Sequence, residues 1–131
     1  MERLKRRARE TEQALQTLTQ ILKEPYSTIV RDATIQRFEY TFESFWKFLR
    51  EYLREHEGLI CNSPKSCFRE ALSVGLLAEE QAMACLQMSD DRNLTSHTYI
   101  ESLAEQIFHR IRDHHKLMLE VFDFIKRKIE G

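Results

Sequence analysis

An arginine, a histidine and a tyrosine stand close together in the run Arg92–Tyr99, whose sequence is RNLTSHTY. An imidazole that exchanges its proton near neutral pH can take the proton of a ribose 2′-hydroxyl. A guanidinium can bind the non-bridging phosphate oxygens and stabilise the negative charge that develops in the transition state. Arg92 and His97 therefore predict an RNA-directed site that breaks a phosphodiester bond without a metal ion.

The placement of the two residues favours a shared cleft. Arg92 ends one predicted helix and His97 precedes the next, and the residues between them are small and polar, which leaves room for a ligand. The alternative interpretation is structural: an arginine in a salt bridge near a helix end, and a histidine with its hydrogen bonds satisfied.

Apolar residues recur at spacings of three and four along most of the chain, which predicts amphipathic helices. Ser63 and Pro64 are a typical helix start, and the polar run 93–98 predicts a break because its side chains compete with helical hydrogen bonding. The expected helices cover about Glu2–Leu22, Thr28–His56, Pro64–Gly75, Ala78–Arg92 and Tyr99–Ile129. The expected inward residues include Phe68, Ala71, Leu72, Ala82, Met83 and Leu86, while Tyr40, Phe48 and Phe124 lie off the main apolar stripes.

The composition agrees with a helical protein. The chain has 131 residues, of which 42% are hydrophobic and 31% charged, with only 3 glycines and 2 prolines. Few turn residues and many charges are typical of long helices. The fold class expected is therefore all-α: an up-and-down bundle of about five helices in a single domain, residues 1–131. The N-terminus lacks an apolar leader and no stretch is long enough to span a membrane, so a cytoplasmic location without membrane contact is expected.

The net charge of −1 argues against a protein held on nucleic acid by bulk charge alone. Positive residues are nevertheless concentrated at both ends, in Arg3–Arg9 and Lys126–Lys128. Our interpretation of these runs is solvated helix faces.

The sequence contains no pattern that predicts a metal site, a cofactor site or a reactive cysteine. Cys61, Cys67 and Cys85 are an odd number, which predicts no disulfide framework and a reducing compartment. Cys67 and Cys85 are expected to be buried structural residues rather than nucleophiles. No tight cysteine pair suits zinc, and His114 falls on an apolar stripe, so no metal site is predicted. A glycine-rich phosphate loop is absent, and no cofactor is expected.

The motif Arg92-x4-His97-x-Tyr99 resembles the R-x4-H-x-Y motif of the HEPN superfamily. Together with the block 31–42 (RDATIQRFEYTF), it resembles the HepT-like branch, whose members are often labelled nucleotidyltransferase substrate-binding proteins. The resemblance implies a homodimeric helical bundle whose two motif regions face each other across a cleft. It also implies pairing with a small minimal nucleotidyltransferase. In the toxin–antitoxin versions, the HEPN protein is a metal-independent endoribonuclease.

The resemblance implies roles for individual residues. His97 would be the general base and Arg92 the transition-state stabiliser, while Asn93 would help to shape the cleft. Tyr99 would be the residue that the partner nucleotidyltransferase adenylylates. Asp32, Arg37 and Tyr40 are weaker candidates for supporting the cleft, and ordinary ion pairing and packing is the alternative for them.

Three functions therefore stay open. The first is an RNase toxin that cuts RNA and leaves a 2′,3′-cyclic phosphate. The second is a non-catalytic subunit that presents substrate to a separate nucleotidyltransferase. The third is a helical homodimer whose polar cleft does no chemistry, which a buried and fully hydrogen-bonded His97 would favour.

Overall fold

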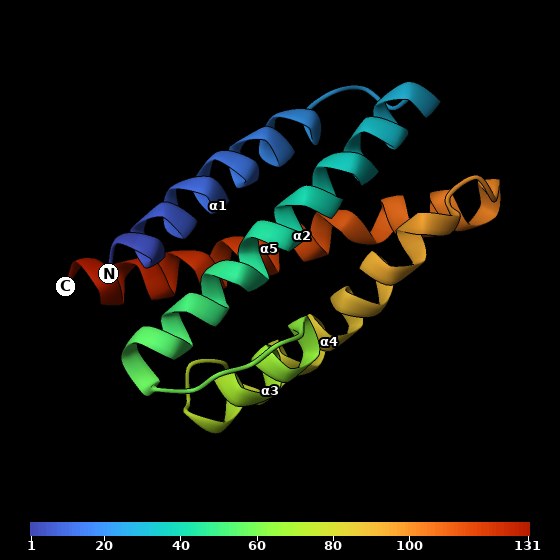
Figure 1. The fold of residues 1–131 in the computed structure, drawn as a ribbon. Helices are drawn as coiled ribbons and strands as arrows, with labels where there is room; N and C mark the ends of the chain where they lie inside the picture. Colours follow the sequence, from blue (N-terminus) through green and yellow to red (C-terminus); the bar gives the residue numbers. More distant parts are fainter.

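The computed structural model describes all 131 residues and contains five α-helices and one short 3-10 helix (Figure 1). The elements are α1 (Glu2–Ile21), α2 (Thr28–Glu57), α3 (Pro64–Ser73), α4 (Glu79–Leu94), η1 (Thr95–His97) and α5 (Glu101–Glu130). The all-α class and the five predicted helices are confirmed. None of the helices combines the length and the apolar character needed to cross a membrane.

The ends of the helices follow local chemistry. The side chain of Ser27 accepts a hydrogen bond from the backbone N–H of Val30 and starts α2. Gly58 ends that helix with φ +67°, a left-handed conformation that glycine adopts without steric cost. Ser63 and Ser66 form a reciprocal capping box at the start of α3.

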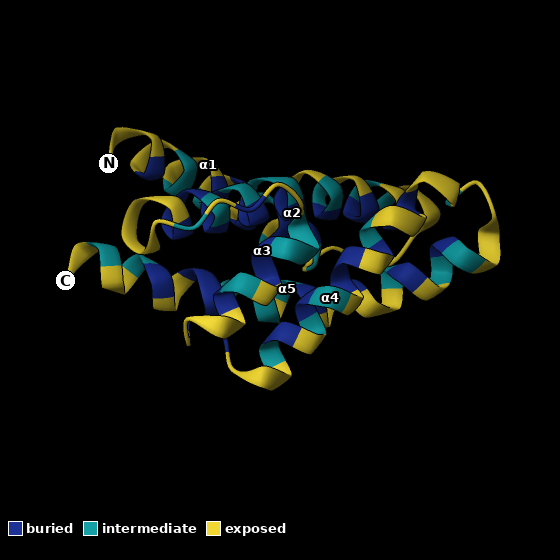
Figure 2. Cartoon of the chain, turned by 60° about the horizontal axis from the view of Figure 1, so that its bottom comes forward, coloured by how far each residue is buried: buried dark blue, intermediate teal, exposed yellow.

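Helix α2 lies at the centre of the bundle and packs against α1, α3 and α5 (Figure 1). Its aromatic residues reach both sides of the core: Phe42 and Phe45 contact Phe68 of α3, and Phe48 contacts Phe122 of α5. A cluster of 29 buried hydrophobic residues lies along the inner helix faces, while the outer faces are largely exposed (Figure 2). A long aromatic helix surrounded by its neighbours therefore organises the fold.

Different segments of the chain meet at the two ends of the bundle. The chain termini lie at one end, where Lys126 of α5 binds Glu12 of α1 at 2.9 Å (Figure 1). The opposite end holds the α1–α2 and α4–α5 connections, where Arg31 binds Glu101 at 2.7 Å. With a rise of about 1.5 Å per residue, helix α5 is about 45 Å long and runs from one end to the other. The Arg92–Tyr99 run thus lies far from the chain termini.

Two expectations for single apolar residues were wrong, and one residue off the main stripes is buried. Phe48 is fully buried although it lies off the main stripe, because α1 and α5 cover a second side of α2. Leu72 and Met83 were expected inside but are 39% and 58% exposed. In α4, the buried face passes through Ala82 and Cys85 instead, which turns Met83 outward.

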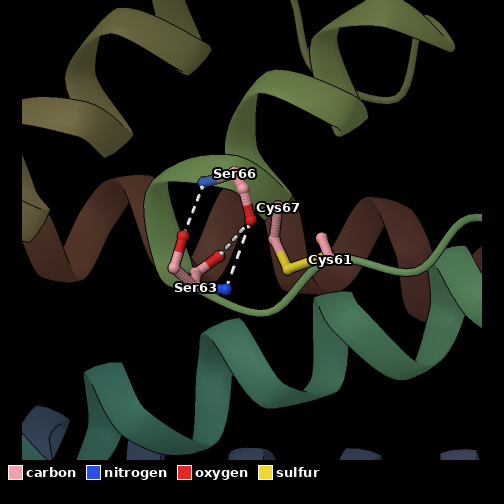
Figure 3. The surroundings of a disulfide bond; sticks show 4 residues. All are labelled: Cys61, Ser63, Ser66 and Cys67. Atoms are coloured by element: carbon pink, nitrogen blue, oxygen red, sulfur yellow. Dashed lines mark hydrogen bonds between the residues drawn. A yellow bond between two sulfur atoms is a disulfide. The ribbon is translucent and has the colours of Figure 1, made fainter.

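The prediction that the cysteines form no disulfide was also wrong, because Cys61 and Cys67 are bonded (Figure 3). The capped turn at Ser63 folds the chain back, so that Cys61 lies over the first turn of α3 with the two Cα atoms 5.3 Å apart. Cys67 and Cys85 are fully buried, as expected. Burial raises the pKa of the Cys85 thiol to about 12, which leaves it a poor nucleophile.

Candidate active site

The Arg92–Tyr99 run lies where α4 passes through η1 into α5. Helix α4 continues two residues beyond the predicted end, to Leu94, before the chain tightens. The hydroxyl groups of Ser96 and Thr98 each donate to the backbone carbonyl three residues earlier, at 3.1 Å. These bonds favour 3-10 over α-helical geometry, which explains why the polar run interrupts the helix.

Arg92 is held by two carboxylates of α2. Its Nη1 lies 3.4 Å from Glu39 Oε2, and its Nε lies 3.5 Å from Glu43 Oε1. Nη1 also donates to the hydroxyl of Thr95 at 3.0 Å, and that hydroxyl lies 3.0 Å from the same Glu39 oxygen. The Arg92 side chain keeps 27% of its surface exposed, and the ion pairs therefore orient the guanidinium without burying it. A phosphate would have to displace carboxylate contacts to bind it.

His97 and Tyr99 both face solvent. Neither ring makes a hydrogen bond within the chain, and the two rings meet edge to face with centroids 6.1 Å apart. Tyr99 is 79% exposed. His97 is thus free to bind a ligand, and the buried, fully bonded histidine that would favour a purely structural cleft is not observed.

The other predicted residues lie on α4 and on two sides of α2. Asn93 is exposed beside Arg92. Asp32 accepts a hydrogen bond from Nε of Arg31 at 3.0 Å. Arg37 and Tyr40 point the other way and both contact Thr17 of α1, with Arg37 Nη1 donating to its carbonyl at 2.7 Å. The structure therefore brings neither Arg37 nor Tyr40 into contact with the Arg92–Tyr99 run.

Arg31 is the buried anchor of this end of the bundle. It donates through Nη1 to Glu101 at 2.7 Å and to Glu105 at 2.9 Å. The hydrogen bonds that Arg31 donates to Glu101 and Glu105, with Asp32 beside them, raise the pKa of Arg31 above its ordinary value. The first turn of α5, directly after Tyr99, is thereby fixed to α2.

Sequence reasoning missed the residues that hold Arg92. Glu39 lies inside the block 31–42 and Glu43 follows one turn later, so an acidic i, i+4 pair was a visible signal. Thr95 was noted only as part of a helix break. What the sequence could not show is that this face of α2 packs beside the end of α4.

A second polar group lies directly beside the motif. His114 Nε2 is 2.6 Å from Asp91 Oδ2, and Arg110 donates to both oxygens of Asp91 at 2.8 Å. His114 is 8% exposed and stacks on Phe38, so the expectation of an ordinary core histidine is confirmed. Burial alone would raise the pKa of Asp91, but the hydrogen bonds from Arg110 and His114 lower it below its ordinary value. This group ties α4 to α5 one residue before Arg92.

No group of three histidine, cysteine, aspartate or glutamate side chains is arranged to hold a metal ion. His109 is 72% exposed and faces Glu105 at 3.6 Å on its own helix. His114 is already committed to Asp91.

The chain is a bundle of five α-helices that presents an Arg/His/Tyr motif where α4 passes into α5. Residues 5–127 match the family described as "Nucleotidyltransferase substrate binding protein like", and the chain belongs to that family. No match is found among curated proteins.

Solved structures agree on the fold. A protein from Thermus thermophilus is 54% identical, with a TM-score of 0.83 over 86% of this chain and 96% of that one. A tri-AMPylated HEPN toxin from Shewanella oneidensis, in complex with an MNT antitoxin, is 16% identical (TM-score 0.77, covering 95% and 96%). A Haemophilus influenzae protein, described as having the fold of a substrate-binding domain of a nucleotidyltransferase, is 22% identical (TM-score 0.66, covering 95% and 98%). At such identities the last two likenesses show the fold alone.

Proposed function

We propose that this protein is a HepT-like HEPN toxin, a metal-independent endoribonuclease that uses Arg92 and His97 and is neutralised by a partner minimal nucleotidyltransferase. The observation that carries the proposal is the exposed, unpartnered imidazole of His97 just after Arg92, whose guanidinium is oriented and still partly exposed. A base that is already hydrogen-bonded within the chain could not accept a substrate proton as readily.

The proposed reaction is an internal transfer at phosphorus. His97 accepts the proton of a ribose 2′-hydroxyl as that oxygen forms a bond to the adjacent phosphorus. The bond between phosphorus and the 5′-oxygen breaks, the 5′-oxygen takes up a proton from water and leaves as a hydroxyl, and His97 returns its own proton to water. Arg92 exchanges its carboxylate contacts for the non-bridging oxygens and stabilises their charge. The products are a 2′,3′-cyclic phosphate and a 5′-hydroxyl end.

A second copy of the chain would complete the site. Ile29 is 82% exposed and Ile100 is 45% exposed, and both lie beside the contact between Arg31 and Glu101 at the motif end of the bundle. Exposed apolar side chains of this size favour an interface. A homodimer that covers them would bring the Arg92 residues of both copies towards one RNA strand and concentrate positive charge on an otherwise neutral protein.

The partner would act on Tyr99. This tyrosine is 79% exposed and its hydroxyl makes no hydrogen bond in the chain, so a nucleotidyltransferase could reach it. The Tyr99 oxygen would form a bond to the α-phosphorus of ATP and release pyrophosphate, and the AMP left on it would place a negative group beside His97 and repel RNA. The AMPylated state and the antitoxin complex named for the Shewanella oneidensis protein support this proposal by analogy.

The test is cleavage of single-stranded RNA by the purified protein. We expect a 2′,3′-cyclic phosphate end and loss of cleavage in His97→Ala and Arg92→Ala. His109→Ala is the matched control, because His109 is also exposed but lies on α5 away from the motif. Undiminished cleavage by His97→Ala would exclude His97 as the base and point to a contaminating nuclease.

One observation favours a second candidate, a non-catalytic subunit that presents substrate to a nucleotidyltransferase. The charge of Arg92 is already offset by Glu39 and Glu43, which weakens its attraction for a phosphate. This candidate predicts co-purification with the partner and no RNase activity. Mass spectrometry after co-expression separates the two: AMP groups on Tyr99 favour the toxin, and an unmodified Tyr99 favours the presenting subunit.

A further inference from the structure

Three arginines converge on a pocket near the C-terminal end of α2. Arg3 of α1 and Arg50 and Arg54 of α2 line a cavity of about 190 Å³. The opposite wall is the chain segment 59–62, which connects α2 to α3. No sequence motif pointed to this site, because its arginines come from two helices.

A buried carboxylate orients two of these arginines. Glu51 is only 2% exposed, and its two oxygens accept hydrogen bonds from Arg3 Nη1 and Arg54 Nε, each at 3.3 Å. Arg54 also lies 3.5 Å from Glu55, but Glu55 is itself paired with the N-terminal ammonium at 3.2 Å. One buried carboxylate cannot neutralise three guanidiniums.

Arg50 supplies the unpaired charge. It has no acidic partner, and its guanidinium lies over the ring of Trp46 at 5.1 Å from the centroid. Stacking on an aromatic face fixes the plane of a guanidinium and leaves its N–H groups available. The pocket therefore presents preorganised donors and surplus positive charge, which suits an oxyanion.

The wall of the pocket is covalently attached to α3. The disulfide between Cys61 and Cys67 ties segment 59–62 to the first turn of α3 (Figure 3). The volume is below the roughly 300 Å³ at which pockets for whole small molecules begin. The pocket therefore fits one phosphate group of a larger molecule rather than a complete nucleotide.

A chain of contacts on α2 connects this pocket to Arg92. Glu43 faces Arg92 at 3.5 Å and accepts a hydrogen bond from Trp46 Nε1 at 3.0 Å, and Arg50 lies over the Trp46 ring. Glu43, Trp46 and Arg50 share one helix face because they are spaced by three and four. Seven residues of α-helix span about 10 Å along its axis, so Arg50 lies about two turns of α2 from the carboxylate that pairs with Arg92.

We propose that Arg3, Arg50 and Arg54 form a phosphate site, which holds a backbone phosphate of the RNA a few nucleotides from the bond that Arg92 and His97 attack. The RNA in this inference rests on the proposed function, whereas the oxyanion chemistry of the pocket does not. The site would also explain how a chain with a net charge of −1 binds RNA: by a few placed contacts instead of a broad basic surface.

The test measures binding separately from cleavage. A labelled short single-stranded RNA is titrated with His97→Ala protein by fluorescence anisotropy over a series of salt concentrations. Adding Arg50→Gln is expected to weaken binding about tenfold, because a charged hydrogen-bond donor is lost. The slope of log K against log salt should fall by about 0.7, the value for one contact to a single strand. Arg50→Lys should recover part of the affinity by restoring the charge.

The matched control is Arg9→Gln, an exposed arginine of α1 that has no ion pair and does not line the pocket. Equal RNA affinity in Arg50→Gln, or equal losses in Arg50→Gln and Arg9→Gln, would overturn the inference. Inorganic phosphate and AMP are added as competitors, and displacement at low concentration by AMP alone would overturn the assignment to RNA. RNA that is bound through Arg50 but never cut by the wild-type protein would refute the proposed RNase and leave the phosphate site standing.

Discussion

Two histidines of this chain have opposite surroundings: His114 contacts Asp91, and His97 follows Arg92 by five residues in the exposed motif. His114 is buried, bonded to Asp91 and stacked on an aromatic ring, while Arg110 clamps the same carboxylate. His97 is exposed and unbonded, and Arg92 is only partly covered. The residue types are the same, but their surroundings differ. The buried group stabilises the junction of α4 and α5, and the exposed pair is left available for a substrate.

The largest effects are expected when each of the two histidines is replaced by alanine. His97→Ala should lower RNA cleavage by about 10²–10⁴-fold, the usual contribution of a general base, and leave the free energy of unfolding unchanged. His114→Ala should have the opposite effects: the free energy of unfolding falls, and the molecules that still fold cleave RNA as before. Paired cleavage assays and urea unfolding curves check this. Equal losses of stability in both variants would erase the distinction between the two groups.

Asp91→Ala is expected to have the next largest effect. It leaves His114 and Arg110 without the carboxylate that both of them contact. Removing one partner of a buried ion pair costs about 3 kcal/mol, with some relief here because Arg110 is partly exposed to water. Chemical denaturation should show the loss, and Asp90→Ala, which removes only an exposed ion pair with Lys65, should show little. A stability unchanged in Asp91→Ala would mean that packing alone holds α4 on α5.

Acid should weaken the buried group selectively. The pKa of Asp91 is lowered in the folded state, so its stabilising contribution is complete above the ordinary aspartate value of about 4 and is lost as the pH falls through the lowered value. The difference in unfolding free energy between wild type and Asp91→Asn should therefore be constant near neutral pH and shrink in strong acid. A difference independent of pH would show that the ionised form of Asp91 contributes nothing.

The features that the sequence predicted depend on residues close together in the chain, whereas the features it missed depend on residues far apart or on a specific turn. Helix existence and the inward position of His114 follow from periodicity, which is local, and both were predicted. The disulfide between Cys61 and Cys67 was missed because their spacing gives no sign of the capped turn that brings them together. The partners of Arg92 were missed for a related reason. Glu39 and Glu43 are about fifty residues earlier in the chain, and only the packing of α4 beside α2 selects them.

The smallest expected effect concerns the carboxylates that restrain Arg92. Glu43→Gln removes one of its two ion pairs, and because both side chains are partly exposed, water screens the pair and the stability should change by less than about 1 kcal/mol. The freed guanidinium should bind single-stranded RNA more tightly, by a few fold at low salt, since the phosphate no longer competes with that carboxylate. Anisotropy titrations of Glu43→Gln against Glu120→Gln, an exposed glutamate of α5, measure this effect at equal net charge. Tighter RNA binding in Glu43→Gln alone would show that Arg92 can leave this carboxylate to bind a phosphate. Equal RNA binding in the two variants would show that the ion pairs of Arg92, like those of Arg110, only stabilise the fold.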